Sequence, residues 1–324
     1  MTSAPIPDPR PSETPIRSLA SQASALAADI KLAHTVFALP FALWAAVLAA
    51  ASVGRLPAGV EVTLVVLCMV LARTFAMTVN RLADARFDAQ NPRTANRAIP
   101  AGRMSRRFAA AAIAATAAGF VLATLGFWAF RDNAWPALLG PAVLALVASY
   151  SFAKRFTALC HVLLGVALAA SPVAAAIAIE PGYLAKPTVW LVAGFVAAWV
   201  AGFDILYALA DADVDRKLGL HAVPAKLGTA GALWCARALH AAAVVALGVA
   251  VTTSPLLGSI TQAAAALVVV LLAVEHALAA LALRRRRHDR DAPDAPLLHH
   301  AFFTLNGVVS VVLGVAGIID AWAG

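Results

Sequence analysis

The stretch that decides the fold is NRLADARFDAQNPRTANRAIPAG, residues 80–102, which directly follows an apolar run of the sequence. Asn80, Asp84 and Asp88 are spaced four residues apart. On a helix, this spacing keeps the three side chains within an arc of about 80° and separates them by about 6 Å per step. They would form one ladder of oxygen atoms, and its two carboxylates repel each other unless a cation compensates them.

The composition of the whole chain indicates a membrane protein. Of its 324 residues, 62% are hydrophobic and only 13% are charged, and the mean hydropathy is +0.82. A soluble domain is usually about half apolar and about a quarter charged. This composition excludes a cytosolic enzyme, a secreted disulfide-rich scaffold and a disordered chain, because most of the surface must face lipid.

Apolar runs of about 20 residues recur along the chain and predict an all-α, polytopic membrane protein with nine transmembrane helices. The predicted spans are residues 32–54, 58–80, 107–130, 134–152, 158–179, 187–210, 230–252, 255–283 and 299–322. Residues 1–30 are polar and read as a disordered or interfacial tail. Residues 31–324 are predicted to form a single transmembrane domain.

The basic residues predict the orientation of these helices. The formal net charge is +8, and the loops after the even-numbered spans carry 17 basic residues, against three after the odd-numbered spans. Basic loops stay on the cytoplasmic side. We therefore expect a multi-pass protein of the cell's inner membrane, with the N-terminus and residues 80–102 on the cytoplasmic side. The same distribution explains the basic charge without a nucleic-acid partner.

A second acidic cluster is expected at the same membrane face. On a continuous helix Asp204, Asp211 and Asp215 fall within about 40° of one another, whereas Asp213 points to the opposite side. Two facing carboxylate ladders favour Mg²⁺ ions that also hold a phosphate-bearing substrate. Nearby basic residues would hold its remaining oxygens; they are Arg93, Arg97, Arg216 and Lys217. The alternative is two solvated acidic helix ends paired with neighbouring arginines.

At these residues the sequence resembles the UbiA superfamily of intramembrane polyprenyltransferases. The first family motif is matched by Asn80, Asp84, Asp88, Arg93, Thr94, Arg97, Pro100 and Gly102. The second is matched by Asp204, Tyr207, Ala208, Asp211 and Asp215, and the segment from Tyr150 through Lys154 and Arg155 is also similar. The resemblance implies spanning helices around a central cavity and Mg²⁺-dependent transfer of a polyprenyl group from its diphosphate to an aromatic ring.

The resemblance also implies roles for individual residues. The metal ligands would be Asn80, Asp84, Asp88, Asp211 and Asp215, and the catalytic set would be these four aspartates with Asp204. The most similar group transfers the chain to 4-hydroxybenzoate in ubiquinone biosynthesis, and an alternative acceptor is 1,4-dihydroxy-6-naphthoate in menaquinone biosynthesis. A hypothesis from another class is a cation-coupled secondary transporter. Transporters place ionisable residues near the membrane midplane, whereas these acids are expected at one face.

The other candidates concern the aromatic acceptor and the reacting carbon. Arg73 precedes Asn80 by seven residues, so it lies on nearly the same helix face about 10 Å deeper. An arginine there is costly unless it is paired or lines a polar cavity. It could bind the acceptor's carboxylate, with Arg155 as the rival. Tyr150 and Tyr207 could stabilise an allylic cation through their ring faces.

Two further interpretations stay open at this stage. Asp204 could position the acceptor's phenol, act as a base, or make only a structural hydrogen bond. The scattered histidines, His34, His161, His240 and His276, show no ligand spacing and read as packed helix residues. The oligomeric state does not follow from the sequence.

Overall fold

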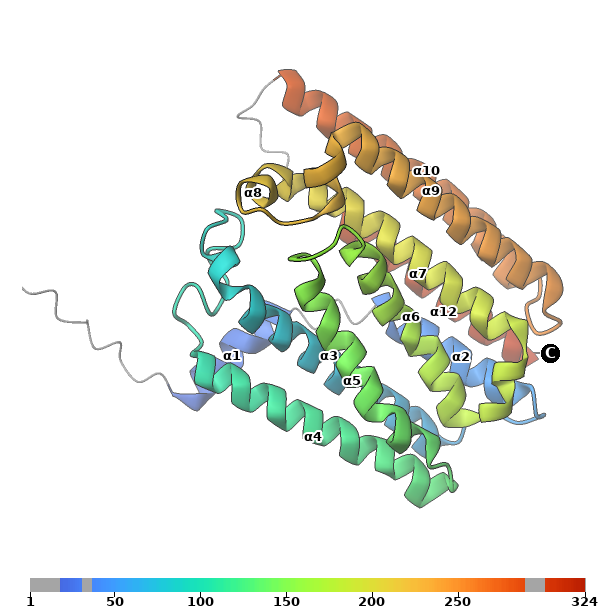
Figure 1. Ribbon diagram of the computed structural model, residues 1–324. Helices are drawn as coiled ribbons and strands as arrows, with labels where there is room; N and C mark the ends of the chain where they lie inside the picture. The colour runs from blue at the N-terminus through green and yellow to red at the C-terminus, as the bar shows by residue number, and fades with distance from the viewer. Residues whose placement is uncertain (1–17, 31–36, 289–300, 324) are drawn as a thin grey trace, which may run out of the picture.

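The computed structural model describes residues 18–30, 37–288 and 301–323, and within these ranges all of its regular secondary structure is helical (Figure 1). The α-helices are α1 (Leu19–Ile30), α2 (Leu39–Ala51), α3 (Gly59–Asp88), α4 (Arg106–Arg131), α5 (Trp135–Ala153), α6 (Cys160–Ile179), α7 (Pro187–Ala208), α8 (Ala212–Lys217), α9 (Val223–Thr253), α10 (Ser259–His288) and α12 (Asn306–Ala323). Shorter helical turns are η2 (Pro181–Ala185), η3 (Leu209–Asp211) and η4 (Ala301–Leu305).

The nine predicted spans correspond in order to nine apolar helices of the described chain. Eight of them are long and apolar enough to cross a membrane, and the ninth, α2, is a shorter apolar helix of 13 residues. The first predicted span began at residue 32, and residues 31–36 lie outside the described part. The all-helical membrane fold predicted from the composition is confirmed.

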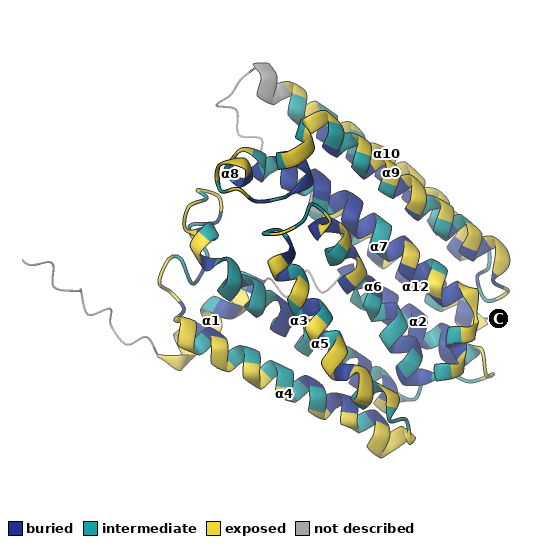
Figure 2. Cartoon of the chain, in the orientation of Figure 1, coloured by how far each residue is buried: buried dark blue, intermediate teal, exposed yellow. Residues whose placement is uncertain are grey.

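The helix α7 forms the centre of the bundle. In an apolar 18-residue stretch of the segment that begins at Pro187, 67% of the residues are buried, against 22% in such a stretch of α4. The helix packs against α6 and α9, while α2 lies against α6 and α12. Figure 2 shows α7 mostly as buried residues, whereas α4 and α10 turn exposed residues outward. Exposed apolar residues on the outer helices fit a surface that faces lipid.

Large aromatic side chains fill the centre around α7. Trp44, Phe41, Phe195 and Trp199 are fully buried, and the rings of Phe195 and Trp199 stack with centroids 5.7 Å apart. Between helices in lipid, such contacts stabilise through close van der Waals packing. The ring of Phe41 on α2 contacts both Phe195 and Trp199, so aromatic side chains join α2 to α7.

Residues 19–30 of the predicted disordered or interfacial tail form the helix α1, so this part is not disordered, and its interfacial position stays a prediction. Its Gln22, Leu26 and Ile30 are buried, and the two apolar side chains pack against Ala98 and Met104 of the loop after α3. The short apolar stripe was too weak to predict a helix without its packing partner. Residues 1–17 lie outside the described residues.

The expected directions of the later aspartates apply to a continuous helix, but the helix is interrupted between residues 204 and 215. The helix α7 ends at Ala208, a 3-10 turn covers Leu209–Asp211, and α8 begins at Ala212. The tighter turn changes the direction in which the following side chains point. Asp211 and Asp215 are buried, whereas the side chain of Asp213 is 83% exposed, so the expected outward direction of Asp213 holds.

Candidate functional site

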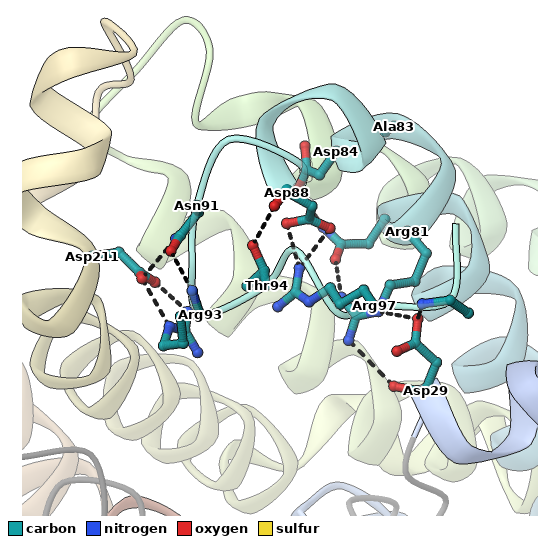
Figure 3. A network of polar contacts seen from close by, with 12 residues as sticks. Asp29, Arg81, Ala83, Asp84, Asp88, Asn91, Arg93, Thr94, Arg97 and Asp211 are labelled. Carbon is teal, nitrogen blue, oxygen red and sulfur yellow. Dashed lines mark hydrogen bonds and ion pairs between the residues drawn. The ribbon is translucent and has the colours of Figure 1, made fainter. Parts of the chain in front are cut away.

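The polar residues singled out from the sequence gather at one end of the bundle, here called the acidic end. Four elements meet there: the last turns of α3, the loop 89–105, the turn after α5, and the segment from the end of α7 through α8. Figure 3 shows the loop carrying Arg93 towards Asp211 and Arg97 towards Asp88. The loop therefore brings the two sequence motifs together, although more than 100 residues separate them.

The first motif forms the ladder that its spacing predicts. Asn80 Nδ2 donates a hydrogen bond to Asp84 Oδ2 at 3.0 Å, one helical turn further along. Asp88 is buried, and Nη1 of Arg97 contacts both of its carboxylate oxygens, at 2.7 and 2.8 Å. Thr94 donates to the backbone carbonyl of Asp88 at 3.1 Å, which pins the loop to the end of α3.

The second motif is tied to the same loop through Asp211. Arg93 forms a bidentate ion pair with this buried carboxylate, with Nε at 2.8 Å from Oδ1. Asn91 Nδ2 donates to Oδ1 as well, at 3.0 Å. Burial alone would lower the pKa of Arg93, but the hydrogen bond and negative charge of Asp211 raise it above the usual range. Arg93 is therefore a permanent cation of the site.

A lysine from the turn after α5 lies between the two motifs. Lys154 Nζ is 2.7 Å from Asp215 Oδ1, and its charge also acts on Asp84 and Asp211. Carboxylates from both motifs thus share one cation. The second oxygen of Asp215, Oδ2, is buried without a hydrogen-bond partner. A buried carboxylate oxygen left in this way is costly, which makes it a candidate to bind an added cation.

The other substrate-binding candidates are placed less uniformly. Arg155 contacts Asp84 at 3.3 Å and the carbonyl of Ala83 at 2.8 Å, and its guanidinium covers the rings of Phe87 and Phe152. The guanidinium carbon of Arg93 lies over the ring of Tyr207, 4.9 Å from the ring centroid. The hydroxyl group of Tyr207 also contacts Arg93. Lys217 is exposed on α8 and is not among the basic side chains that contact the acidic residues.

Asp204 does not join the carboxylates of Asp211 and Asp215. Its Oδ2 is 2.6 Å from Nδ1 of His161 on α6, and that histidine is 3% exposed. The break after Ala208 separates Asp204 from the later aspartates. The interpretation of His161 as a residue that only packs is incomplete, because it also contacts Asp204. The sequence could not show this contact, since no spacing links α6 to α7 at this height.

An apolar cavity of about 260 Å³ runs between α2, α3, α4, α5 and α6. Most of its lining is alanine, valine, leucine and phenylalanine, and its polar groups include Arg73 and Tyr150. Arg73 Nε is buried and has no hydrogen-bond partner, and no ion pair is formed by Arg73 within the described chain. The deep arginine thus lines a cavity, but this cavity is mostly apolar and not the polar one expected from the sequence.

The described residues contain no group of three or more acidic, histidine or cysteine side chains already close enough to hold a metal ion. Asp88, Asp211 and Asp215 each contact an arginine or a lysine instead. In a low-dielectric environment, such charges pair with whatever countercharge is present. The donor set still fits Mg²⁺, which prefers carboxylate oxygens together with substrate phosphate oxygens, and Oδ2 of Asp215 is available.

Comparison with known proteins decides the family. Residues 38–307 match the model of the UbiA prenyltransferase family. This chain belongs to that family. Two similar curated proteins are both named 4-hydroxybenzoate octaprenyltransferase. The one from Stutzerimonas stutzeri is 34% identical over 194 residues, 58% of this chain and 60% of that protein. The one from an Enterobacter species is 36% identical over 152 residues, 46% of this chain and 50% of that protein. These matches span half to three fifths of the relatives' length.

Solved structures show the same fold over nearly the whole chain. The apo structure of a UbiA homologue from Aeropyrum pernix is 32% identical, with a TM-score of 0.75 over 89% of this chain and 98% of that one. A UbiA homologue from Archaeoglobus fulgidus bound to DMAPP and Mg²⁺ has a TM-score of 0.63 at 18% identity, over 94% of this chain and 100% of that one. At that identity the likeness supports the fold alone.

Sequence reasoning missed several residues of this UbiA-family site. Asn91 holds Asp211, and His161 holds Asp204. Asp29 on α1 forms an ion pair with Arg81, with Oδ2 of the aspartate 3.2 Å from Nε of the arginine. Arg81 also donates a hydrogen bond to Asn80 Oδ1 at 3.1 Å. Asn91 follows the first motif in a loop that pattern reasoning cannot fold. Asp29 gave a weak signal, as an acidic residue close to the first apolar run.

Proposed function

We propose that this protein transfers a polyprenyl group from a polyprenyl diphosphate to an aromatic acid of the 4-hydroxybenzoate type, in a Mg²⁺-dependent reaction of quinone biosynthesis. The observation that carries the proposal is the apolar cavity lined by Tyr150 of α5 and by Arg73 of α3, the helix that ends in the carboxylate ladder. A polyprenyl diphosphate matches this arrangement, because it has a long apolar chain and a charged head. The curated relatives named as 4-hydroxybenzoate octaprenyltransferases support this acceptor class.

The ligand-free ion pairs suggest how the diphosphate would be held. Asp88, Asp211 and Asp215 pair with Arg97, Arg93 and Lys154. When substrate arrives, the carboxylates would turn to Mg²⁺ and the basic side chains to phosphate oxygens. Guanidinium groups suit this exchange because they bind carboxylate and phosphate with the same bidentate geometry. Asn80 and Asp84 complete the proposed metal ligands, and Lys217 on the exposed face of α8 would join only if its side chain turns inward.

Mg²⁺ at these carboxylates would act as a Lewis acid that neutralises the diphosphate and improves it as a leaving group. The protein's own residues would do the rest. Arg93, Arg97 and Lys154 would hold the departing pyrophosphate. The rings of Tyr150 and Tyr207 would face the allylic carbon as positive charge develops there, a contact worth about 0.5–2 kcal/mol for each ring. The apolar lining of the cavity would keep water away from that carbon.

The aromatic acid would meet a different set of groups. Arg73 would bind its carboxylate, since an unpaired arginine in an apolar cavity is costly until an anion reaches it. Arg155 suits that role less well, because it already contacts Asp84 and the carbonyl of Ala83. Asp204 would face the acceptor's hydroxyl group. These roles would place the ring between the cavity and the diphosphate.

The loop charges support an inner-membrane protein with the acidic end on the cytoplasmic side, where both proposed substrates would be made.

The test of the proposed function is a membrane assay with labelled polyprenyl diphosphate, supplied with 4-hydroxybenzoate or with 1,4-dihydroxy-6-naphthoate. We expect label in a prenylated 4-hydroxybenzoate only when Mg²⁺ is present. Label in the naphthoate alone would select the alternative acceptor. Full activity in excess chelator would contradict the metal ligands, and cation-driven uptake without transfer would favour a transporter.

A further inference from the structure

His161 occupies the first turn of α6 and contacts two other helices. Its Nδ1 is 2.6 Å from Asp204 Oδ2 on α7. Its Nε2 accepts a hydrogen bond from the backbone N–H of Val223, the first residue of α9, at 3.2 Å. The ring is 3% exposed, so water cannot easily replace either partner.

The contact with Val223 fixes the proton on the imidazole ring. The first N–H groups of a helix have no partner inside the helix, so Val223 must donate outward. A ring nitrogen that accepts a hydrogen bond carries no proton, and in a neutral imidazole the proton is then on the other nitrogen. Nδ1 therefore donates to Asp204, whose Oδ2 is the acceptor. The backbone of α9 thus determines which nitrogen of His161 donates to α7.

Asp204 keeps one carboxyl oxygen that His161 does not contact. Its side chain is 24% exposed, so the carboxylate is not enclosed by His161. Tyr150 and Arg73 line the apolar cavity, whereas Asp204 is not among its lining residues. One oxygen of Asp204 contacts the histidine, and the other can accept a hydrogen bond from a bound ligand.

We propose that His161 is a positioning residue that orients the carboxyl group of Asp204 as the acceptor for the hydroxyl group of the aromatic substrate. This inference rests on the proposed function. In the reaction, the bond between the allylic carbon and the diphosphate oxygen breaks, and its electron pair leaves on pyrophosphate. The hydroxyl group passes its proton to Asp204 as the ring carbon forms the new carbon–carbon bond, which gives a ring ketone. The alkylated carbon then loses its own proton to the departing pyrophosphate, and the ketone oxygen takes its proton back from Asp204. The histidine touches no reacting atom.

Two substitutions separate the two hydrogen bonds of His161. In His161→Asn, the side-chain amide can take the place of Nδ1 and donate to Asp204. In His161→Gln, the longer side chain can reach the place of Nε2 and accept from Val223, but it provides no donor at Nδ1. We expect kcat of H161Q to fall about 100-fold, because a misplaced catalytic group costs about this much. The KM for the prenyl diphosphate should stay within about twofold, and H161N should recover most of kcat.

The measurements are initial rates at varied concentrations of each substrate, together with the thermal melting of each variant in the same membrane mimic. Asp204→Asn should resemble H161Q. The inference is overturned if H161Q or D204N keeps the wild-type kcat. It is also overturned if H161N and H161Q lose kcat and melting temperature equally, because the histidine is then only a clamp between three helices. If the wild-type protein transfers no prenyl group to any aromatic acid, the proposed function itself fails.

Discussion

At the scale of single residues, Asp211 and Asp213 form a matched pair for testing the proposed metal ligands. Asp211 is buried and contacts Arg93, whereas Asp213 is exposed and contacts only Arg216, which is exposed as well. We expect Asp211→Asn to reduce prenyl transfer by at least 100-fold, since Mg²⁺ contributes several kcal/mol to the transition state. Asp213→Asn should keep wild-type activity. Initial rates with labelled diphosphate at saturating Mg²⁺ measure both variants, and equal rates would remove Asp211 from the ligand set.

Substitution of Arg73 is predicted to weaken binding of the aromatic acid without lowering the stability of the fold. Its guanidinium lines an apolar cavity without a partner among the described residues, so it contributes no ion pair to the folded state. We expect Arg73→Met to melt at the same temperature as the wild type or higher. Its KM for the aromatic acid should rise at least tenfold, because the carboxylate loses a charged hydrogen bond worth about 1.5–3 kcal/mol.

The control for this variant is the KM for the prenyl diphosphate, which Arg73→Met should leave unchanged. If R73M instead unfolds at a lower temperature with both KM values intact, the arginine has a structural role. Substitution of Arg155 would then be the next experiment on the acceptor's carboxylate.

At the scale of elements, α1 is predicted to hold the loop 89–105 in place. Asp29 contacts Arg81 at 3.2 Å and accepts from the backbone of Ala98 at 3.3 Å, while Gln22 accepts from Ser105 at 3.0 Å. The side chains of Asp29 and Arg81 are 11% and 10% exposed. Breaking such a buried pair by removing one partner costs about 3–5 kcal/mol. Asp29→Ala should therefore lower the melting temperature and speed proteolysis of the loop 89–105.

The exposed Ser21 on the same helix provides the control, and Ser21→Ala should change neither measurement. The double variant Asp29→Ala, Arg81→Met should regain part of the stability, because it removes the charge that Asp29→Ala leaves unpaired. If Asp29→Ala alone keeps the wild-type melting temperature and proteolysis rate, α1 does not hold the loop 89–105 in place.

The spanning helices followed from the sequence because each carries about 20 apolar residues, whatever surrounds it. The ladder of Asn80 and Asp84 followed as well, since both lie on one helix of regular pitch. The pairing of Asp204 with His161 could not be predicted. It depends on the break after Ala208 and on the packing of α6 against α7, and both arise from tertiary contacts. The loop 89–105 has no period, so the reach of Asn91 to Asp211 also needed the structure.

At the scale of the whole molecule, five helices enclose the cavity, and its depth should limit the part of the prenyl chain that it shields. Val143 lines the cavity on α5 and lies seven residues from Tyr150, a distance of about 10 Å along the helix. Its neighbour Ala142 is exposed and does not line the cavity. A tryptophan at 143 would fill the space beyond the first part of the chain, whereas a tryptophan at 142 would face outward.

We therefore expect Val143→Trp to lower kcat/KM for a long polyprenyl diphosphate at least tenfold while keeping the rate with dimethylallyl diphosphate within about threefold. The physical reason is steric, because the indole ring would occupy the space that the later isoprene units need, whereas dimethylallyl diphosphate has only one such unit. Ala142→Trp should leave both rates unchanged. Equal loss with both donors would mean that the tryptophan disturbs the charged end of the site. Unchanged rates with both donors would mean that the chain leaves sideways into lipid before it reaches Val143, so that the membrane rather than the protein sets the length it accepts.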